Sequence, residues 1–273
     1  MKTLKHHTLI YDQDCPLCVA YTQGFIKSGM LDNEGRHPFQ KIDEFNQSNL
    51  NKNRAVNEIA LVDKKTQKVT YGLASLLKII GYSFPIIERI GNQPTLNLML
   101  KKLYNFVSYN RKVIVSNKQN TTVSNQCEPA FNYKYRLLYI AFAAITSAYI
   151  LTLFVATLPI AQLTTNFGFE LLAVLLQIPF QLLFLKEKNT KIMLNYTGHL
   201  ITVSLIGALL LLPLLLINYI FALPVQILVI TFMMVVAFMI FLHKKRVDNL
   251  NLPPRLTFTW ILYRLLLGTL ILL

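Results

Sequence analysis

The chain has 273 residues, which is room for about two domains, and its 27 Lys and Arg against 13 Asp and Glu give a formal net charge of +14. Such a basic chain is a candidate for binding nucleic acid, but it contains no helix-turn-helix pattern, zinc-finger spacing or aromatic-basic RNA motif, so we exclude that class. Residues 1–136 hold 19 of the basic and 10 of the acidic residues, whereas residues 137–273 consist mainly of long apolar runs. The first part is therefore predicted to be water-soluble, and the second to lie in a bilayer, where cytoplasmic loops are rich in Lys and Arg.

The first predicted strand, residues 8–12, leads into the most reactive side chains of the chain. Cys15 and Cys18 follow it, and Pro16 between them suits the first turn of a helix. A helix N-terminus favours a thiolate over a thiol, so Cys15 is the predicted nucleophile and Cys18, one turn further on, the resolving thiol. We assign Asp12 a modulating role, because a nearby carboxylate raises a thiol pKa by repulsion or relays protons through water.

The rest of the first part alternates between predicted strands and helices. The helix that begins at Pro16 should end near Gly29, where the chain turns. The further expected elements are a strand at 39–43, a helix or loop to about residue 54, a hairpin of strands at 58–63 and 68–72, and amphipathic helices at 73–81 and 95–111. Their order, β-α-β-α-β-β-α, predicts a thioredoxin-like α/β domain with the two cysteines after its first strand.

Two other interpretations of the cysteine pair remain open. The pair is also suited to form half of a zinc site, completed by Cys127 or by His6 and His7, although no second C-x-x-C and no H-x-x-x-H follows. Alternatively, the thiols are redox-inert and the domain is a docking module for a membrane partner.

A polar segment at residues 116–136 joins the two parts and contains the third cysteine. We interpret it as a solvated tether that ends in a membrane-edge anchor of aromatic and basic residues, 133–136. The alternative is that the tether allows Cys127 to exchange disulfides with Cys15.

The motifs of the first part resemble those of a known family. Asp12, Cys15 and Cys18 are spaced D-x-x-C-x-x-C within "YDQDCPLC", and Asn110 and Arg111 lie in the closing "YNFVSYNRKV". Together with the helix that begins "YGLASLLKII", these residues resemble the DCC family of predicted thiol-disulfide oxidoreductases, which are thioredoxin-like. The resemblance implies that a dithiol of Cys15 and Cys18 exchanges disulfides with a protein substrate.

The resemblance covers residues 7–115 and assigns residues 1–115 to one domain. The chain departs from the family at Gln13, where a glycine is usual. It also departs from thioredoxin itself, because "NRAVNEIALV" lacks the cis-proline that faces the dithiol there.

The second part, residues 137–273, is predicted to be an all-α bundle of four or five membrane spans. Crossing a hydrocarbon core of ~30 Å takes about 20 residues, and 17 at the least. Four runs qualify: residues 137–158, 169–185, 198–221 and 223–242. A fifth, 256–273, carries Arg264 and is either a last span, which we favour, or a helix in the interface.

Basic residues are concentrated on one side of these spans. They lie before the first span, in "LKEKNTK" and in "HKKRVDNLNLPPR", whereas the other two loops have none. The positive-inside rule then places the N-terminal domain in the cytoplasm. The start of the chain lacks the apolar stretch of a secretory signal, which also favours a cytoplasmic N-terminal domain. Thiols in the cytosol stay reduced. We expect a bacterial inner membrane.

Polar residues inside the spans need partners or a role. An unpaired Arg264 costs at least ~2.5 kcal/mol in a bilayer, and Glu170 is the candidate partner. His199 and His243 are interpreted as interfacial, with contact to a ligand or quinone as the alternative. No cysteine lies in this part, so it cannot relay disulfide equivalents. A quinone is the only cofactor left open, since histidines are too few to favour haem.

The sequence thus predicts a membrane-anchored thiol-disulfide oxidoreductase whose bundle holds the dithiol near a membrane substrate. The alternative is a non-enzymatic assembly or regulatory subunit that binds other membrane subunits. A Cys15→Ser substitution distinguishes the two hypotheses, because it should abolish the function of an enzyme and leave that of an assembly subunit intact. A third hypothesis, a small-molecule carrier, has only Glu170, His199 and Arg264 in its favour.

Overall fold

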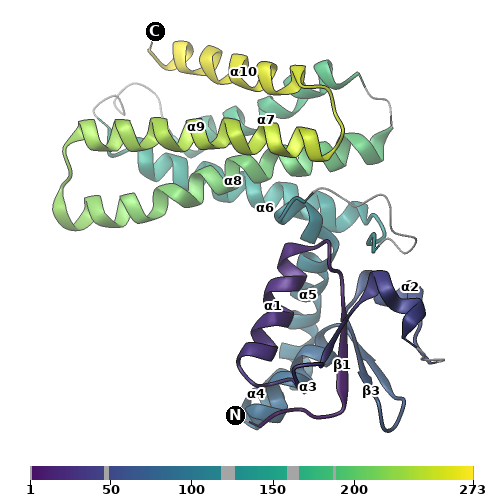
Figure 1. Cartoon of the computed structure of the whole chain (residues 1–273). Coiled ribbons are helices and arrows are strands. Elements are labelled where there is room, and N and C mark those ends of the chain that lie inside the picture. Colours follow the sequence, from purple (N-terminus) through teal and green to yellow (C-terminus); the bar gives the residue numbers. More distant parts are fainter. Residues whose placement is uncertain (1, 46–48, 118–126, 159–165, 187–188, 273) are drawn as a thin grey trace. The chain divides into compact units, whose positions relative to one another are not determined.

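The computed structural model describes residues 2–45, 49–117, 127–158, 166–186 and 189–272, the side chains of 270–272 excepted. The chain divides into two compact units, Met1–Tyr135 and Arg136–Leu273 (Figure 1). The centre of the predicted tether, 118–126, and parts of two predicted loops, 159–165 and 187–188, lie outside the described residues.

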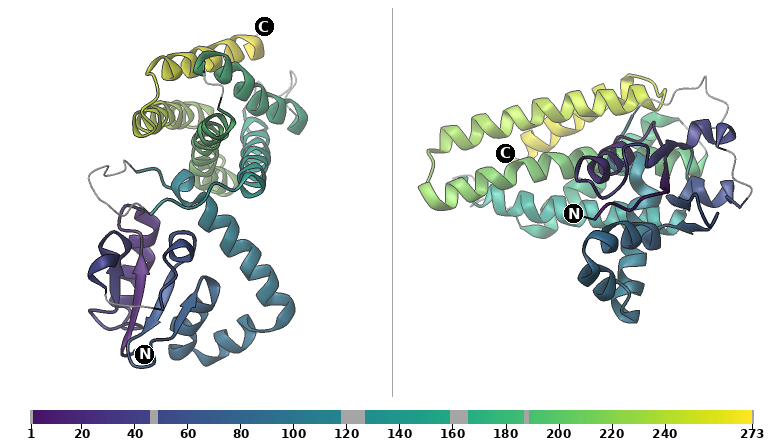
Figure 2. Two further views of the ribbon diagram at one scale, coloured as in Figure 1. Left: turned by 90° about the vertical axis from the view of Figure 1, so that its right-hand side faces the viewer. Right: turned by 60° about the horizontal axis from the view of Figure 1, so that its bottom comes forward.

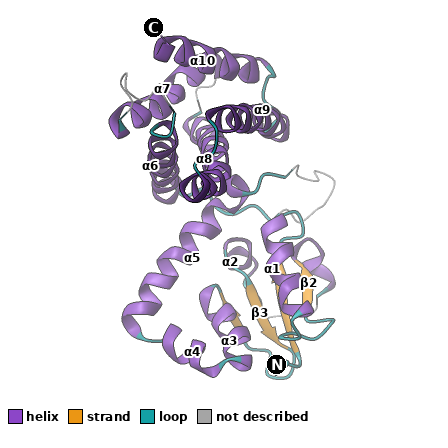
Figure 3. Ribbon diagram, turned by 90° about the vertical axis from the view of Figure 1, so that its left-hand side faces the viewer, coloured by secondary structure: helices purple, strands orange, loops and turns teal. Residues whose placement is uncertain are grey.

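The N-terminal unit is built on a mixed sheet of four short strands (Figure 3). Its elements are β1 (His7–Tyr11), α1 (Pro16–Lys27), β2 (Arg36–Pro38), the 3-10 helix η1 (Phe39–Glu44), α2 (Lys52–Asn57), β3 (Ala60–Asp63), β4 (Val69–Tyr71), α3 (Leu73–Ser83), α4 (Pro85–Gly91) and α5 (Pro94–Ile114). The strand order is β2-β1-β3-β4, with β1 parallel to β2 and antiparallel to β3. The predicted hairpin of β3 and β4 is confirmed.

Helices cover both faces of this sheet, because alternate residues of each strand point to opposite sides. Leu9 and Leu61 pack on one face with apolar side chains of α1, α3 and α5. Ile10, Ala60 and Val62 pack on the other face with side chains of η1 and α2. The carboxyl end of β1 therefore lies between the helices on the two faces of the sheet, and the loop with the cysteine pair follows it.

Two elements differ from the sequence prediction. The sequence predicts a strand at 39–43, but Phe39–Glu44 is a 3-10 helix, and the strand beside β1 is Arg36–Pro38. Phe39 and Gln40 are both buried in this helix, and the Gln40 amide hydrogen-bonds to Asp12. The helix α4 is absent from the sequence prediction.

The second unit consists of helices (Figure 2). They are α6 (Tyr133–Val155), α7 (Phe167–Leu185), α8 (Thr190–Phe221), α9 (Val225–Asn249) and α10 (Arg255–Leu272). In the part of the chain that the structure describes, α6, α7, α8 and α9 are long and apolar enough to cross a membrane, which fits an integral membrane protein in contact with lipid. The helix α10 is not among these four and packs against α7 and α9.

The largest extensions beyond the predicted spans are those of α8 and α9. The predicted span 198–221 is part of α8, which begins at Thr190, and the predicted span 223–242 is part of α9, which ends at Asn249. The basic residues 244–246 therefore lie on a helix and not in a loop. A helix bonds its own backbone groups, so it need not end where the hydrocarbon core ends.

Candidate functional site around Cys15 and Cys18

The loop after β1 places Cys15 at the entrance of α1. Cys15 is the N-cap residue, with extended backbone angles, and Pro16 fills the first helical position. The Cys15 Sγ accepts a hydrogen bond from the backbone N–H of Cys18 at 3.5 Å. This is the position in which a helix N-terminus stabilises a negative charge on sulfur.

The two thiols of this pair are electrostatically unlike. A hydrogen bond from the Cys18 side chain, helped by the positive charge of Arg111, lowers the pKa of Cys15 to about 7, although burial and Asp12 act against it. The same hydrogen bond raises the pKa of Cys18, and burial raises it further. Near neutral pH, the pair therefore holds its negative charge on Cys15 and a proton on Cys18.

Asp12 holds the loop in place through its carboxylate. Its Oδ1 accepts hydrogen bonds from Gln40 Nε2 at 2.8 Å and from the backbone N–H of Asp14 at 3.1 Å. Its backbone carbonyl accepts a hydrogen bond from the N–H of Cys15 at 3.3 Å. Its Oδ2 forms a buried ion pair with Arg111 Nη2 at 3.5 Å. The predicted modulating residue is thus mainly a fixed anchor of the cysteine loop.

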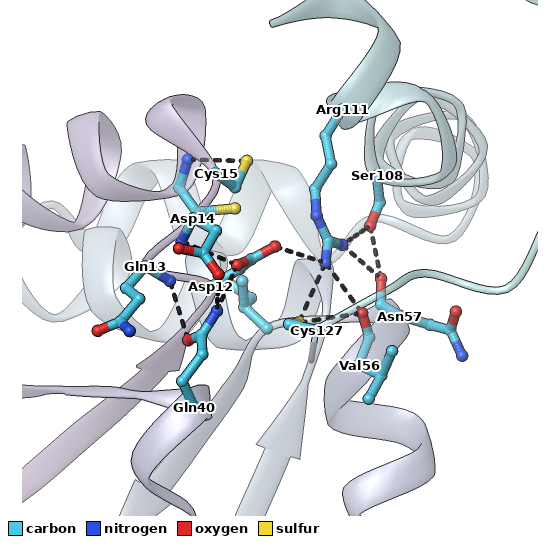
Figure 4. A network of polar contacts seen from close by, with 12 residues as sticks. Asp12, Gln13, Asp14, Cys15, Gln40, Val56, Asn57, Ser108, Arg111 and Cys127 are labelled. Atoms are coloured by element: carbon cyan, nitrogen blue, oxygen red, sulfur yellow. Dashed lines mark hydrogen bonds and ion pairs between the residues drawn. The ribbon is translucent and has the colours of Figure 1, made fainter. Parts of the chain in front are cut away.

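Arg111, near the end of α5, connects the cysteine loop to the end of α2 (Figure 4). Its Nη2 donates to the carbonyl of Val56 at 3.0 Å, and its Nη1 to the carbonyl of Asn57 and to Ser108 Oγ, both at 3.4 Å. Burial by itself lowers the pKa of Arg111, but the acidic groups around it, the three cysteines and Asp12, outweigh burial when they are ionised and raise that pKa. Arg111 therefore remains a fixed positive charge beside the thiols.

Cys127 belongs to the same cluster, which corrects its interpretation as part of a solvated tether. Its side chain is 3% exposed and packs on the sheet face that η1 and α2 cover. Its Sγ accepts from Arg111 Nη2 at 3.3 Å and donates to the carbonyl of Val56 at 3.7 Å. Burial raises the pKa of Cys127 to about 12, although the charge of Arg111 opposes this, so Cys127 is a thiol at neutral pH.

The positions of the described side chains do not support a zinc site at the cysteine pair. Among the described residues, no three or more His, Cys, Asp or Glu side chains gather as they would around a metal ion. His6 and His7 lie at the start of β1, whereas Cys15 follows its end, and a strand of this length spans about 13 Å.

The cysteine pair is largely covered by protein. Cys15 is 1% exposed and Cys18 is 4% exposed. The chain that follows α5 lies against their loop, because Asn117 Nδ2 donates to the carbonyl of Asp14 at 3.3 Å. A partner protein reaches Cys15 only when the side chains over it move aside.

In the second unit, Arg264 has partners other than the one predicted. Its Nη2 donates to Gln177 Oε1 at 2.8 Å and to Ser204 Oγ at 3.1 Å. Glu170 is buried at the start of α7, but no described carboxylate forms an ion pair with Arg264. The expectation that this charge has a partner is confirmed, and Glu170 interacts with it electrostatically without a direct ion pair.

His199 and His243, which the sequence analysis interprets as interfacial, are buried among side chains of the second unit. They are 4% and 1% exposed. His199 Nδ1 lies 3.1 Å from Arg246 Nη1. His243 lies between Tyr196 Oη and Thr257 Oγ1, each 3.2 Å from one of its ring nitrogens.

The network around His243 was not predicted, because it joins four helices. Tyr196 of α8 also bonds to Gln181 of α7 at 2.9 Å, while Thr257 lies on α10 and His243 on α9. Nothing in the local sequence relates residues so far apart, although the polar residues within apolar runs were the available signal.

No family model, curated protein or solved structure matches this chain.

Proposed function

We propose that this protein is a membrane-anchored thiol-disulfide oxidoreductase of the DCC type, whose N-terminal unit is a thioredoxin-like domain. The observation that carries the proposal is the position of Cys15 at the N-cap of α1, bonded to Cys18, with its pKa lowered to about 7. The element order from β1 to α3 supports it, since it is the order that the resemblance implies. The four membrane helices supply the anchor.

The reaction follows from the unequal thiols. The Cys15 thiolate attacks one sulfur of a substrate disulfide, forming a mixed disulfide and releasing the other substrate sulfur as a thiolate. Cys15 then no longer carries a charge, so the hydrogen bond that raises the pKa of Cys18 is lost. Cys18 gives up its proton, attacks Cys15 and releases the second substrate thiol. Two electrons pass from the dithiol to the substrate, and the Cys15–Cys18 disulfide remains.

Arg111 and Asp12 have opposite effects on the Cys15 thiolate. The charge of Arg111 lowers the pKa of Cys15, whereas that of Asp12 raises it. Their ion pair fixes both charges in place, so neither needs to reorganise when the thiolate forms. Arg111 is therefore a positioning residue in the proposed reaction, and Asp12 is its counter-ion.

The proposed location is the cytoplasmic side of a bacterial inner membrane. Basic residues flank α6 and α9 at the ends that the positive-inside rule assigns to the cytoplasm. Reducing conditions there keep the dithiol ready to donate electrons.

The second candidate function is a non-enzymatic assembly or regulatory subunit. One observation favours it: Cys15 and Cys18 are almost fully buried, whereas catalytic cysteines are usually accessible. In this alternative, the cysteines are core residues and the N-terminal unit docks onto another membrane subunit.

The test measures thiol reactivity on the full-length protein in detergent. We expect the alkylation rate of Cys15 to rise with pH and to reach half its maximum near pH 7, because the thiolate is the reactive form. Cys15→Ser should remove this fast phase, and the Cys18→Ser variant should retain a reactive thiol but form no internal disulfide. Oxidised glutathione should convert the wild-type pair to a disulfide.

The outcome separates the two candidates. Thiols that react only at high pH and form no disulfide in oxidising glutathione buffers contradict the enzyme and leave the assembly subunit. A Cys15→Ser variant that still complements a deletion strain leads to the same conclusion.

A further inference from the structure

The exposed apolar side chains of the N-terminal unit are confined to one short segment. Among the described residues that precede α6, every large hydrophobic side chain that is exposed lies between residues 82 and 103. They are Tyr82, Phe84, Ile86, Ile87, Ile90, Leu98, Met99 and Leu103, which we name the α4–α5 face. Exposed apolar residues scattered singly need no explanation, but such a concentration marks a binding surface.

Three helices that pack together carry this face. They are the end of α3, the short α4 and the first half of α5, which contact one another on one side of the unit (Figure 3). In α4, Ile86 is 72% exposed and Ile87 and Ile90 are about as exposed as Tyr82. The Glu88 side chain is turned the other way and packs against Gly81 of α3. This helix therefore turns its apolar residues outward and its acidic residue inward.

The charges beside the α4–α5 face are basic. Arg89, Lys101 and Lys102 are exposed on the same helices as the apolar residues. Glu88 is the only acidic residue of the segment 82–103, and it faces α3. Long Lys and Arg side chains can extend from an apolar surface to anionic headgroups, so the face suits the boundary between headgroups and acyl chains.

We propose that the α4–α5 face binds the surface of the membrane in which the chain is anchored, with the apolar side chains among the acyl chains and the basic ones at anionic phosphates. The charge pattern selects this occupant, because an acidic lipid surface complements it. The four membrane helices of the same chain keep such a surface at a high effective concentration. The N-terminal unit then lies on the bilayer and does not hang free on a tether.

The α4–α5 face and the cysteine pair lie at different places along α5. Met99 and Arg111 lie on one helix, twelve residues apart, which corresponds to about 18 Å along α5. Arg111 contacts the cysteine loop through Asp12. The inference is independent of the proposed redox chemistry, but it would place the dithiol at a fixed height above the membrane.

The test uses the full-length protein in vesicles of phosphatidylethanolamine and phosphatidylglycerol with brominated acyl chains, which quench tryptophan on contact. Trp260 is buried in the second unit, so the signal is the emission that a new tryptophan adds to that of the wild type. Met99→Trp should show added emission that brominated lipid quenches at least about twofold. Lys65→Trp, in the exposed turn between β3 and β4, is the matched control and should not be quenched.

Two further measurements test whether the basic residues of the α4–α5 face contribute to lipid binding. Adding Lys101→Glu and Lys102→Glu to Met99→Trp should weaken the quenching, and so should vesicles of phosphatidylcholine alone at high salt, because both remove the attraction to anionic headgroups. Unquenched emission with the spectrum of an exposed tryptophan overturns the proposal. A blue-shifted but unquenched emission also overturns it, because protein and not lipid then covers the face.

Discussion

Each unit of this molecule holds an arginine inside a polar network, Arg111 buried and Arg264 half-buried, but the two charges are balanced in different ways. Arg111 has a carboxylate, that of Asp12, and the backbone carbonyls of α2 as partners. Arg264 hydrogen-bonds to neutral oxygens, those of Gln177 and Ser204, and its guanidinium lies 5.1 Å from the centre of the Trp260 ring, while Glu170 acts on it electrostatically without a direct ion pair. One arginine is an ion-pair partner, and the other is a donor to amide and hydroxyl groups.

The difference indicates what each charge does. The Arg111 ion pair holds the cysteine loop in place. The permanent positive charge of Arg111 also lowers the pKa of Cys15. Arg264 joins three helices, because it lies on α10 and bonds to α7 and α8. A buried ion pair is costly to break, since one charge remains unpaired, whereas neutral partners lose only a hydrogen bond.

The largest effect is expected for Arg111→Met. Asp12 is 3% exposed, so the substitution leaves its buried carboxyl group without a counter-ion. We expect the free energy of unfolding of the N-terminal unit to fall by about 3–5 kcal/mol, the usual range for one partner removed from a buried pair. Urea titration of the full-length protein measures it, with alkylation of buried Cys127 as the report of unfolding. Loss of the positive charge should also raise the pKa of Cys15 above about 7.

A double variant and a surface variant test the reason for this effect. Asp12→Asn combined with Arg111→Met should recover a large part of the lost stability, because no unpaired charge remains. Arg54→Met removes an arginine from an exposed ion pair with Glu58 and should change stability by less than about 0.5 kcal/mol. A double variant no more stable than Arg111→Met would show that packing, and not the charge, is what the arginine supplies.

The local parts of this site could be predicted from sequence, because they depend on neighbours in the chain. A strand, a C-x-x-C pair and a proline at the first helical turn predict the N-cap position of Cys15, and the structure has it. Gly29 has a φ of 71° just past the end of α1, which is the left-handed conformation that a glycine there predicts.

The long-range parts could not be predicted, because residues far apart in sequence form them. Gln40 is 28 residues from Asp12, and it bonds to Asp12 from a 3-10 helix where the sequence predicts a strand. Cys127 lies in a polar segment, and only the fold shows that it is buried against Arg111. The carbonyls of Val56 and Asn57 that hold Arg111 come just before β3, in the segment that lacks the proline of thioredoxin.

A smaller effect is expected for Arg264→Met in the second unit. The substitution leaves Gln177 and Ser204 without a donor and breaks no direct ion pair of the described residues, although it removes the positive charge that acts on Glu170. We expect a loss of about 1–3 kcal/mol, the cost of unsatisfied buried polar groups, in unfolding by a denaturing detergent. Lys244→Met, at an exposed position of α9, is the control. A loss as large as that of Arg111→Met would mean that Arg264 also balances a negative charge, and Glu170 would then be the partner to substitute next.

The smallest effect is expected for Tyr196→Phe, which removes one hydroxyl from the network of Gln181 and His243. Hydrogen bonds between membrane helices contribute about 0.6 kcal/mol on average, because the unfolded chain also finds partners within the membrane. Detergent unfolding should therefore show a loss of this size, and Tyr149→Phe, at a position 58% exposed, should show none. A loss above about 2 kcal/mol would exceed what one such bond supplies. It would show that removing the hydroxyl leaves both Gln181 and His243 without a partner, so that more than one hydrogen bond is lost.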